Sequence, residues 1–211
     1  MRELILKMSM TLDGFVGGAE GQVDWLFQSQ DEAAVAWTLQ TVWNASLHIM
    51  GGRTFRDMAA FWPTSTGVFA PPMNQIPKAV FSKRGAAILT AGENTAALVD
   101  ARADAASDGS AVPQPGAESW AEAYVASGDL AAEVAKLKVG DGKPIIAHGG
   151  AGFARSLIAS GLVDEYALLV HPVALGRGLP IFADLSAPMR LRLVRSQAFP
   201  GGAIAQIYRP A

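Results

Sequence analysis

The chain has 211 residues, no cysteine and a formal net charge of −2, and half of its residues are hydrophobic. This length and hydrophobic share predict a single domain over residues 1-211 with a sizeable core, and they exclude a disordered chain. The absence of cysteine excludes disulfides, thiolate metal sites and cysteine nucleophiles, and it agrees with the cytoplasmic location that we expect. The charge gives no support to a nucleic-acid partner, and no apolar run approaches the roughly 20 residues of a membrane span.

The first half of the chain alternates short apolar runs with polar turns. Residues 3-10 are a strand candidate without the architecture of a signal peptide, and a glycine-rich loop follows them. Residues 31-45 have the apolar spacing of a helix, and further strands are predicted at 47-50 and 78-81. Residues 85-117 are rich in Ala, Asp, Ser, Gly and Pro, and we interpret them as a long loop inserted into the domain.

The second half predicts one larger unit and a hairpin. Residues 129-138 begin acidic and end basic, as the dipole of a helix favours. The stretch 144-182 has the pattern of a strand, a glycine turn, a helix and a second strand, which together form a βαβ unit with a right-handed crossover. Residues 191-199 and 203-209 flank a Pro-Gly-Gly turn and predict an antiparallel hairpin.

A glycine cluster lies at the turn of the βαβ unit, where Gly149, Gly150 and Gly152 follow His148. A helix N-terminus carries unpaired N–H groups, and residues without a Cβ atom let a phosphate approach the backbone closely. The spacing is not the full dinucleotide fingerprint GxGxxG, and the acidic residue expected about 20 residues further on is not clearly placed. A tight strand-to-helix turn without a ligand is therefore the alternative.

A second glycine turn follows the strand at 47-50, where Gly51 and Gly52 precede Arg53 and Thr54. An arginine at a helix N-terminus offers planar, charge-assisted donors to a phosphate. The threonine can cap the helix or donate its hydroxyl to a phosphate oxygen. This turn is therefore a second candidate site for phosphate.

The strand at 78-81 ends in Ser82, Lys83 and Arg84. A hydroxyl and two cations at the carboxyl end of a strand would suit the 2′-phosphate that distinguishes NADP from NAD. A solvated basic turn is the alternative for the same three residues.

Two carboxylates are candidates for chemistry on a substrate. Asp13, which is followed by Gly14 in a turn signal, is the leading candidate for orienting a substrate or a water, and a turn residue that bonds its own backbone is the alternative. Asp31 could contact a substrate ring, whereas a helix cap is its more common role. His148 and His171 lie at predicted strand ends without a matched carboxylate, so no metal site is predicted.

Four segments occur in a characteristic order along the chain: SMTLDGFVG, MGGRTF, VFSKR and IIAHGGAGFARSLIASGLVDEYALLVHPVALGRGLPIF. In this order they resemble the dihydrofolate-reductase-like superfamily, and within it the RibD C-terminal reductase group. The resemblance covers nearly the whole chain outside residues 85-117. It implies a three-layer α/β/α domain with a mixed, mainly parallel sheet, an antiparallel C-terminal hairpin and NADPH along the carboxyl edge of the sheet.

The resemblance also implies which residues serve the site. The cofactor would contact Gly51, Gly52, Arg53, Thr54, Ser82, Lys83, Arg84, His148, Gly149, Gly150, Ala151, Gly152 and Phe153. Asp13 and Gly14 would lie near the nicotinamide and the substrate. Asp31 is the nearest match to the carboxylate that dihydrofolate reductase carries on its first helix.

The implied activity is an NADPH-dependent reductase that transfers a hydride to a small heterocyclic substrate. The model for it is the 5-amino-6-(5-phosphoribosylamino)uracil reductase of riboflavin biosynthesis. A dihydrofolate or pterin reductase is one alternative, and a non-catalytic nucleotide-binding protein is another, because no proton donor is clearly matched. Members of the group are often homodimers, and we expect a homodimer here.

Overall fold

The computed structural model describes residues 1–29, 31–89, 96–104 and 112–211. Within them, eight strands form one sheet in the order β4-β3-β2-β5-β1-β6-β8-β7. The strands are β1 (Leu4–Thr11), β2 (Leu47–Gly51), β3 (Lys78–Phe81), β4 (Tyr124–Ala126), β5 (Ile145–Ala147), β6 (Glu165–His171), β7 (Leu191–Ala198) and β8 (Ile204–Pro210). The helices are α1 (Trp25–Gln28), α2 (Glu32–Trp43), α3 (Gly52–Ala59), α4 (Ala70–Gln75), α5 (Ala96–Asp104), α6 (Leu130–Lys138) and α7 (Ala151–Ala159), with 3₁₀ turns η1 (Trp62–Thr64), η2 (Gly85–Leu89) and η3 (Ala117–Trp120).

The sheet is mixed and mainly parallel, as the sequence predicts. β1 lies inside it and pairs in parallel with β5 on one side and β6 on the other. β8 then pairs antiparallel with β6, and β7 pairs antiparallel with β8. Five of the eight residues of β1, LILKMSMT, are apolar, because both faces of a parallel strand are covered by other layers.

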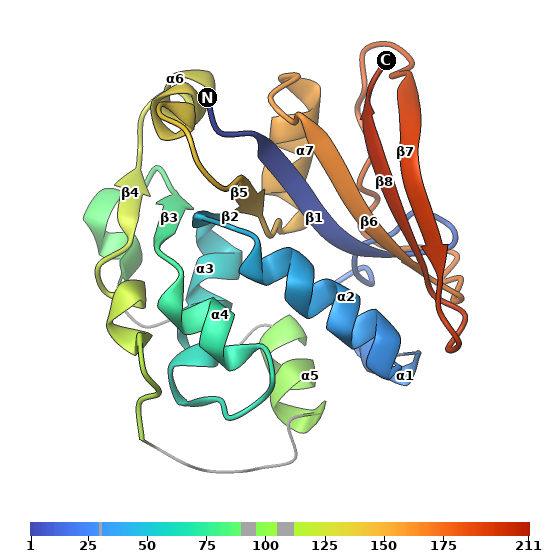
Figure 1. The fold of residues 1–211 in the computed structure, drawn as a ribbon, viewed down its shortest axis with the longest axis horizontal. Coiled ribbons are helices and arrows are strands. Elements are labelled where there is room, and N and C mark those ends of the chain that lie inside the picture. The colour runs from blue at the N-terminus through green and yellow to red at the C-terminus, as the bar shows by residue number, and fades with distance from the viewer. Residues whose placement is uncertain (30, 90–95, 105–111) are drawn as a thin grey trace.

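Helices cover the parallel part of the sheet on both faces, which gives the three layers (Figure 1). On one face, Leu157 and Ile158 of α7 belong to the same buried cluster as Leu4 and Leu6 of β1. On the other face, Val42 of α2 packs in a cluster with residues of β2 and α4. Each such apolar side chain contributes roughly 1.5–3 kcal/mol when it is fully buried, so the two clusters hold the layers together. The expected α/β/α fold is confirmed.

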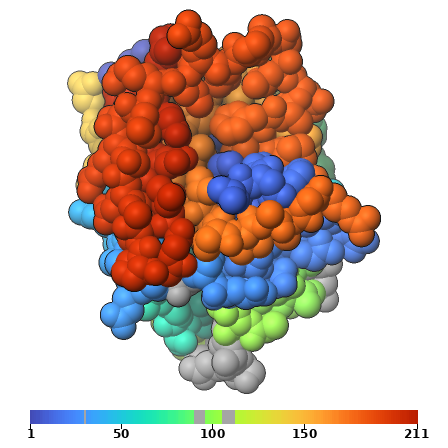
Figure 2. Space-filling model, turned by 90° about the vertical axis from the view of Figure 1, so that its right-hand side faces the viewer, coloured from blue at the N-terminus to red at the C-terminus, as the bar shows by residue number. Residues whose placement is uncertain are grey.

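The C-terminal hairpin lies at one edge of the sheet, on the same side of the molecule as the loop that follows β1 (Figures 1 and 2). Side chains of β7 are largely exposed, including Leu193 at 50% and Val194 at 47%. Leu12, in the loop after β1, is 72% exposed. This side therefore presents several apolar side chains to its surroundings.

Residues 85–117 differ from the predicted long loop. The described part contains η2, α5 and η3, and α5 buries Leu98 to 2% exposure. The polar composition of the segment hid a short apolar strip, Ala97, Leu98 and Ala101, that faces the rest of the domain. Residues 90–95 and 105–111 of the predicted loop lie outside the described residues.

The order of the strands determines where a ligand can bind. After β1, the chain builds β2, β3 and β4 on one side of it, then places β5 between β1 and β2 and β6 on the opposite side. Connections that leave a parallel sheet in opposite directions open a crevice at the carboxyl ends of the strands. Such a crevice is therefore expected at the carboxyl ends of β1, β2, β5 and β6. Within the described residues, no helix combines the length and the apolar character that a membrane crossing requires.

Candidate active site

A pocket of about 1450 Å³ lies at the carboxyl ends of these strands. Its described lining comes from β1, the loop after β1, α1, α2, the β2–α3 turn, η1, α5, the β5–α7 turn and β6. The volume exceeds the roughly 300–1,000 Å³ of a site for one small ligand. The pocket thus has room for two molecules side by side.

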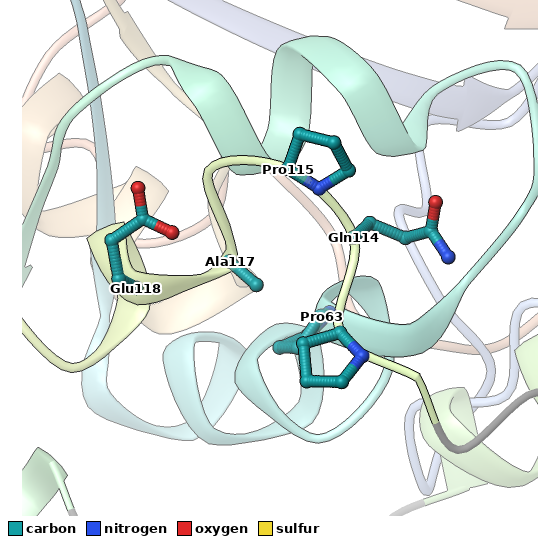
Figure 3. A pocket seen from close by; sticks show the side chains of 6 residues that line it. Pro63, Gln114, Pro115, Ala117 and Glu118 are labelled. Carbon is teal, nitrogen blue, oxygen red and sulfur yellow. The ribbon is translucent and has the colours of Figure 1, made fainter.

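A second hollow, of about 630 Å³, lies between η1 and η3 (Figure 3). It is lined by Pro63, Pro113, Gln114, Pro115, Ala117 and Glu118, none of which lines the large pocket. Glu118 is its one ionisable side chain among these residues, and no glycine turn reaches it. The chemistry of the molecule therefore belongs to the large pocket.

The two glycine turns predicted to bind phosphate lie side by side at one end of this pocket. The Gly51 N–H donates to the Gly149 carbonyl at 3.2 Å, and the Gly150 N–H donates to Thr54 Oγ1 at 2.6 Å. These bonds form because β2 and β5 are parallel neighbours that end at the same edge. The structure therefore brings together two motifs that are about 100 residues apart in the sequence.

Both helices that follow these turns begin without a side-chain cap. Gly51 precedes α3 and Gly150 precedes α7, and neither helix start receives a hydrogen bond from a capping side chain. An uncapped helix start presents unpaired N–H groups and the positive end of the helix dipole. Arg53 and Arg155 of these two helices add positive charge to the same lining. This end of the pocket is suited to phosphate oxygens, and we call it the glycine end.

Glycine is required at two positions of the glycine end. A Cβ atom at Gly51 would lie 2.9 Å from Phe153 Cβ. Gly149 has φ of +82°, and a Cβ atom there would lie 2.7 Å from Met8 Sδ. Glycine at these two positions therefore lets the turns pack closely. The first turn of α7 is open in contrast, because a Cβ atom at Gly152 would meet no atom within 4 Å.

The third basic motif lies beside the glycine end but outside the lining of the pocket. The Cβ atom of Ser82 lies 3.4 Å from the position that a Cβ atom of Gly52 would occupy. Lys83 and Arg84 are exposed, and the Lys83 ammonium donates to the Gly128 carbonyl at 2.8 Å. The structure thus brings Ser82 to the start of α3, whereas the two cations face outward. Their role with a 2′-phosphate stays a prediction.

Asp13 holds two loops together. One carboxylate oxygen accepts from the Thr11 hydroxyl at 2.5 Å and the other accepts from the Gly176 N–H at 2.7 Å. The Thr11 hydrogen bond is the main cause that lowers the pKa of Asp13. The neighbouring Gly14 has φ of +87° and accepts from the Ile181 N–H at 3.2 Å. Neither Asp13 nor Gly14 lines the pocket, so their predicted catalytic and substrate roles have no direct contact to support them.

Asp31 is the N-cap of α2. Its Oδ1 accepts from the Ala34 N–H at 2.9 Å, and its Oδ2 accepts from the Gly201 N–H at 2.6 Å. The first of these bonds is the main cause that lowers the pKa of Asp31. The carboxylate thus fills the start of α2, and the cap that the sequence offered as the alternative is present. Asp31 itself does not line the pocket, although Ala34 and Val35 of the same helix do.

Two further polar residues line the pocket: Lys7, which the sequence did not single out, and His171, which the sequence placed at a predicted strand end. Lys7 of β1 makes no hydrogen bond or ion pair within the described residues, and burial lowers its pKa to about 8. His171, at the end of β6, is 1% exposed, and its Nδ1 lies 2.7 Å from Ser29 Oγ. The His171 Nε2 is buried without a partner among the described residues, and Trp25 packs edge-on against the ring at 5.3 Å. We call this region, together with α1, α2 and Leu169, the lysine end.

One sequence signal could have identified Lys7. A lysine in an otherwise apolar central strand, between Leu6 and Met8, is rare unless its ammonium reaches a partner or a pocket. Because side chains alternate along a strand, Lys7 faces away from the α7 side, where Leu6 and Met8 are packed. Ser9 lies two residues further on and lines the same pocket.

His148 lies between the two ends and packs edge-on against His48, with ring centres 4.5 Å apart. Burial is the main cause that lowers the pKa of both imidazoles, to about 3 for His48 and well below the ordinary value for His148. Both are therefore neutral at pH 7. The described residues contain no group of three potential metal ligands. His148 donates its backbone N–H to the Ile49 carbonyl at 3.0 Å, which fixes the strand end before Gly149.

α5, from the segment predicted as a loop, forms a wall of the pocket. Ala97, Leu98 and Ala101 line it, and Asp100 accepts from the Val23 N–H at 2.7 Å. This bond ties α5 to the glycine-rich loop after β1. The inserted segment therefore contributes to the shape of the site.

Comparison with known proteins identifies the same group as the sequence motifs. The family model described as the RibD C-terminal domain matches residues 2–205. Two proteins of Bacillus subtilis (strain 168) are similar over most of their length. The uncharacterized protein YyaP is 28% identical over 207 residues, which cover 98% of this chain and 94% of YyaP. The uncharacterized protein YwjB is 23% identical over 208 residues, which cover 94% of this chain and 92% of YwjB.

Solved structures share the fold. A pyrimidine reductase-like protein from Corynebacterium diphtheriae superposes with a TM-score of 0.59 at 16% identity, covering 100% of this chain and 92% of that one. A diaminohydroxyphosphoribosylaminopyrimidine deaminase/5-amino-6-(5-phosphoribosylamino)uracil reductase from Thermotoga maritima gives a TM-score of 0.63 at 18% identity, with 100% of this chain and 57% of that chain covered. At these identities the likeness concerns the fold. The match of the family model over residues 2–205 shows that the chain belongs to the RibD C-terminal domain family, a family of reductase-like domains.

Proposed function

We propose that the protein is an NADPH-dependent reductase that transfers a hydride to a small heterocyclic substrate. The observation that carries this proposal is the pair of uncapped helix starts, α3 and α7, that meet at the glycine end of the pocket. The Gly51–Gly149 and Thr54–Gly150 hydrogen bonds hold these starts together as one unit. Two adjacent helix N-termini are suited to the two phosphates of a dinucleotide.

The cofactor would bind at the glycine end. Backbone N–H groups of Ala151, Gly152 and Phe153 would hold the pyrophosphate, because the Gly150 N–H is already donated to Thr54 Oγ1. Gly51, Gly52, Arg53, Thr54 and Gly150 would complete the site, with His148 beside it. When bound, the nicotinamide supplies the hydride. The protein itself positions the two reactants and excludes water from between them.

The proton for the reduced substrate has one candidate source that the structure adds. Lys7 reaches the lysine end of the pocket, and its pKa of about 8 keeps most of it protonated at pH 7. A group with a pKa near the working pH is an effective acid. Asp13 remains the candidate from the sequence, acting through a water because it does not line the pocket. Gly14 and Asp31 remain candidates for shaping the substrate site from outside its lining.

The substrate of the riboflavin-pathway reductase, 5-amino-6-(5-phosphoribosylamino)uracil, is the first compound to test. A solved structure with this fold carries that activity in its name. Dihydrofolate or a pterin is the alternative substrate. A protein that binds the nucleotide without catalysis is the third possibility. The observation that favours it is that Asp13 and Asp31, the two carboxylates singled out by the sequence, do not line the pocket.

The decisive experiment is a titration with NADPH followed by a turnover assay. Saturable binding at micromolar concentration is the expected result, and its absence would reject the reductase. Arg53→Ala should weaken the binding by about tenfold, since a charge-assisted hydrogen bond contributes about 1.5–3 kcal/mol. Lys143→Ala, an exposed cation whose ammonium donates to the Trp43 carbonyl, is the matched control and should leave the binding unchanged.

The preference for NADPH over NADH tests the third basic motif. If Ser82, Lys83 and Arg84 bind the 2′-phosphate, Lys83→Ala or Arg84→Ala should reduce the preference and leave NADH binding unchanged. Equal preference in the variants and the parent would show that the 2′-phosphate binds elsewhere. The outward position of the two cations makes this the sharpest test of a residue assignment taken from the family.

We also propose that the protein is a homodimer. Leu12, Leu193 and Val194 have exposed apolar side chains, and burial of such groups favours association. The C-terminal hairpin, which carries two of them, faces the viewer in Figure 2. Light scattering after size-exclusion chromatography should give twice the mass of the chain. Val194→Lys should shift the protein to a monomer, whereas the monomeric mass in the parent protein would reject the proposal.

A further inference from the structure

Lys7 is the one residue of the strands that brings a full charge at pH 7 to the described lining of the pocket. It makes no hydrogen bond or ion pair within the described residues, and burial lowers its pKa to about 8. His148 and His171 line the same pocket and are neutral at pH 7, because burial is the main cause that lowers the pKa of each imidazole. At pH 7 the sheet therefore presents one unpaired positive charge to the pocket.

Other elements also bring charged side chains to the pocket. They come from the loop after β1 and from α3, α5 and α7, and they are Glu20, Arg53, Asp57, Arg102, Asp104 and Arg155. No carboxylate of this set forms an ion pair with Lys7 in the part of the chain that the structure describes, and burial is the cause of its shifted pKa. The charge of Lys7 is therefore open to a ligand.

Lys7 lies one strand away from the glycine turn that precedes α7. Leu6 pairs with Ala147 in the parallel ladder of β1 and β5, whose strands are about 4.8 Å apart, and Lys7 and His148 come next on the two chains. Leu6 and Ala147 belong to the cluster on the α7 side, so the side chains of Lys7 and His148 point to the opposite face. Since Gly149 follows His148 directly, Lys7 lies beside the place where the glycine end begins.

A dinucleotide held at the glycine end has one direction left within the pocket. The described lining continues from the glycine turns to β1 and β6, and it includes no residue of β3. The nicotinamide ring would therefore extend over β1, next to Lys7. This ring is uncharged in NADPH and positively charged in NADP⁺. The two forms of the nucleotide thus differ in charge at the place where Lys7 adds its own.

We propose that Lys7 makes the pocket selective for the oxidation state of the nucleotide, because its ammonium repels NADP⁺ and tolerates NADPH. This inference rests on the proposed function, and it adds a residue that decides which form of the cofactor stays bound. Two like charges that face each other in a pocket repel strongly. We expect Lys7 to weaken NADP⁺ relative to NADPH by about thirtyfold, which corresponds to about 2 kcal/mol.

The same lysine would link this selectivity to turnover. In the proposed reaction the substrate gains a hydride from the nucleotide and a proton from Lys7. Lys7 becomes neutral as the nicotinamide ring becomes positive, so the total charge beside β1 does not change. When Lys7 takes a proton back from water, the repulsion returns and favours the release of NADP⁺.

Equilibrium titrations with NADPH and with NADP⁺ measure the selectivity as the ratio of the two dissociation constants. Both nucleotides carry the same phosphates, so the contribution of the glycine end cancels in this ratio. In the parent protein the ratio should be high at pH 7 and should fall at about pH 9.5, where Lys7 is mostly neutral. Carboxylates and guanidinium groups keep their charge over this range, and His148 and His171 stay neutral.

Variants assign the effect to Lys7. Lys7→Met should lower the ratio about thirtyfold at pH 7 and remove its pH dependence. Lys7→Arg keeps a positive charge at about pH 9.5 and should therefore hold the ratio high there. Lys143→Met is the matched control: Lys143 is an exposed cation outside the described lining, and its loss should change neither the ratio nor its pH dependence.

A second lysine with a lowered pKa, Lys78 at about 7, has to be told apart from Lys7. Burial is the main cause of its shift, and its ammonium donates to the Asn74 carbonyl at 2.8 Å, outside the described lining of the pocket. Lys78 is unchanged in the Lys7 variants. A pH dependence that persists in Lys7→Met would therefore belong to another group and would overturn the inference.

The same titrations separate this inference from the proposed function. Binding of NADPH with an equal ratio in the parent and in Lys7→Met keeps the reductase and rejects the role of Lys7. Failure of NADPH to bind rejects both. Thermal unfolding shows whether each variant is folded, and if Lys7→Met is not, the comparison of Lys7→Arg with the parent at about pH 9.5 decides, since equal ratios there reject the role of the charge.

Discussion

The helices at the two ends of the pocket begin in opposite ways. α7 follows Gly150 and offers its first N–H groups to the pocket, whereas α2 follows Asp31, whose carboxylate takes an N–H of its first turn. The backbone of a helix start is the same in both cases, and only the side chain before it differs. The comparison teaches that a helix start can bind an anion only where no side chain caps it. A single capping carboxylate is enough to remove such an anion site.

The largest expected effect on NADPH affinity comes from a negative charge at the uncapped start of α7. Gly152→Asp places a carboxylate in the first turn of α7, where a side chain has free space. Repulsion of about 4 kcal/mol between charges about 4 Å apart, at the effective dielectric constant of a protein surface, should weaken NADPH binding by about 100-fold or more. The melting temperature should not fall, because an acidic residue favours a helix N-terminus. Fluorescence titration and thermal unfolding measure the two effects.

Ser156→Asp is the control for this change, because it places the same charge one turn further along α7, on an exposed position outside the lining. It should reduce NADPH affinity far less. Equal affinity in Gly152→Asp and the parent would contradict the assignment of the open helix start to phosphate.

The next effect concerns the pH dependence of folding. Burial lowers the pKa of His48 to about 3 and that of His171 to about 4, from an ordinary value of 6.5. The unfolded chain therefore binds more protons than the folded protein below pH 6.5, so stability is present above this pH and is lost as the pH falls toward 4. Each histidine contributes a slope of up to about 1.4 kcal/mol per pH unit.

Urea unfolding at a series of pH values measures this slope. His171→Leu should remove about one histidine's share of the slope between pH 6.5 and 4. A slope that is unchanged in the variant would show that His171 titrates normally in the folded protein and that the lysine end is open to charge.

A smaller effect is expected at the capped helix. Asp31→Ala removes the acceptors of the Ala34 and Gly201 N–H groups, so the melting temperature should fall by a few degrees. NADPH affinity should stay constant, because this helix start does not serve the nucleotide. Asp31→Asn keeps a capping oxygen and should recover most of the stability. A pH–rate profile that loses a pKa in Asp31→Asn would instead support the role on the substrate that the sequence suggested.

The smallest effect is again at Gly152. Gly152→Ala adds a methyl group into open space at a helical position. Alanine is favoured over glycine in a helix by about 0.5–1 kcal/mol, so equilibrium unfolding in urea should show a small gain in stability. NADPH affinity should remain within about threefold of the parent, a change below 1 kcal/mol. A large loss of affinity would show that the backbone at this position needs the freedom of glycine.

The sequence was informative where backbone geometry depends on residue type. Gly51, Gly149 and Gly150 indicate turns in which backbones approach each other closely. The structure places these turns in contact. The order of strands and helices, with the family motifs, was sufficient for the three-layer fold and its antiparallel end. These features follow from local patterns that repeat across proteins with the same fold.

The lysine end could not be read from the sequence in the same way. Lys7, Ser29 and His171 come from three separate elements, and their proximity depends on the pairing of β1 with β6 and on where α1 packs. Asp13 and Asp31 attracted interest because they are acids near a predicted site, yet each bonds to the backbone of a distant loop. The sequence did not reveal the contribution of α5, because a short helix of mostly small and polar residues has a weak periodic signal.

The wall made by α5 has a consequence for how this protein could change its substrate. α5 lies in an inserted segment whose described residues add no strand to the sheet, and it is tied to the loop after β1 by the Val23–Asp100 bond. The glycine end, by contrast, is held by contacts between two turns that follow neighbouring strands. Replacement of the inserted segment would therefore change the pocket wall that Ala97, Leu98 and Ala101 form. The shape of the pocket could thus vary between related proteins while the two glycine turns keep their contacts.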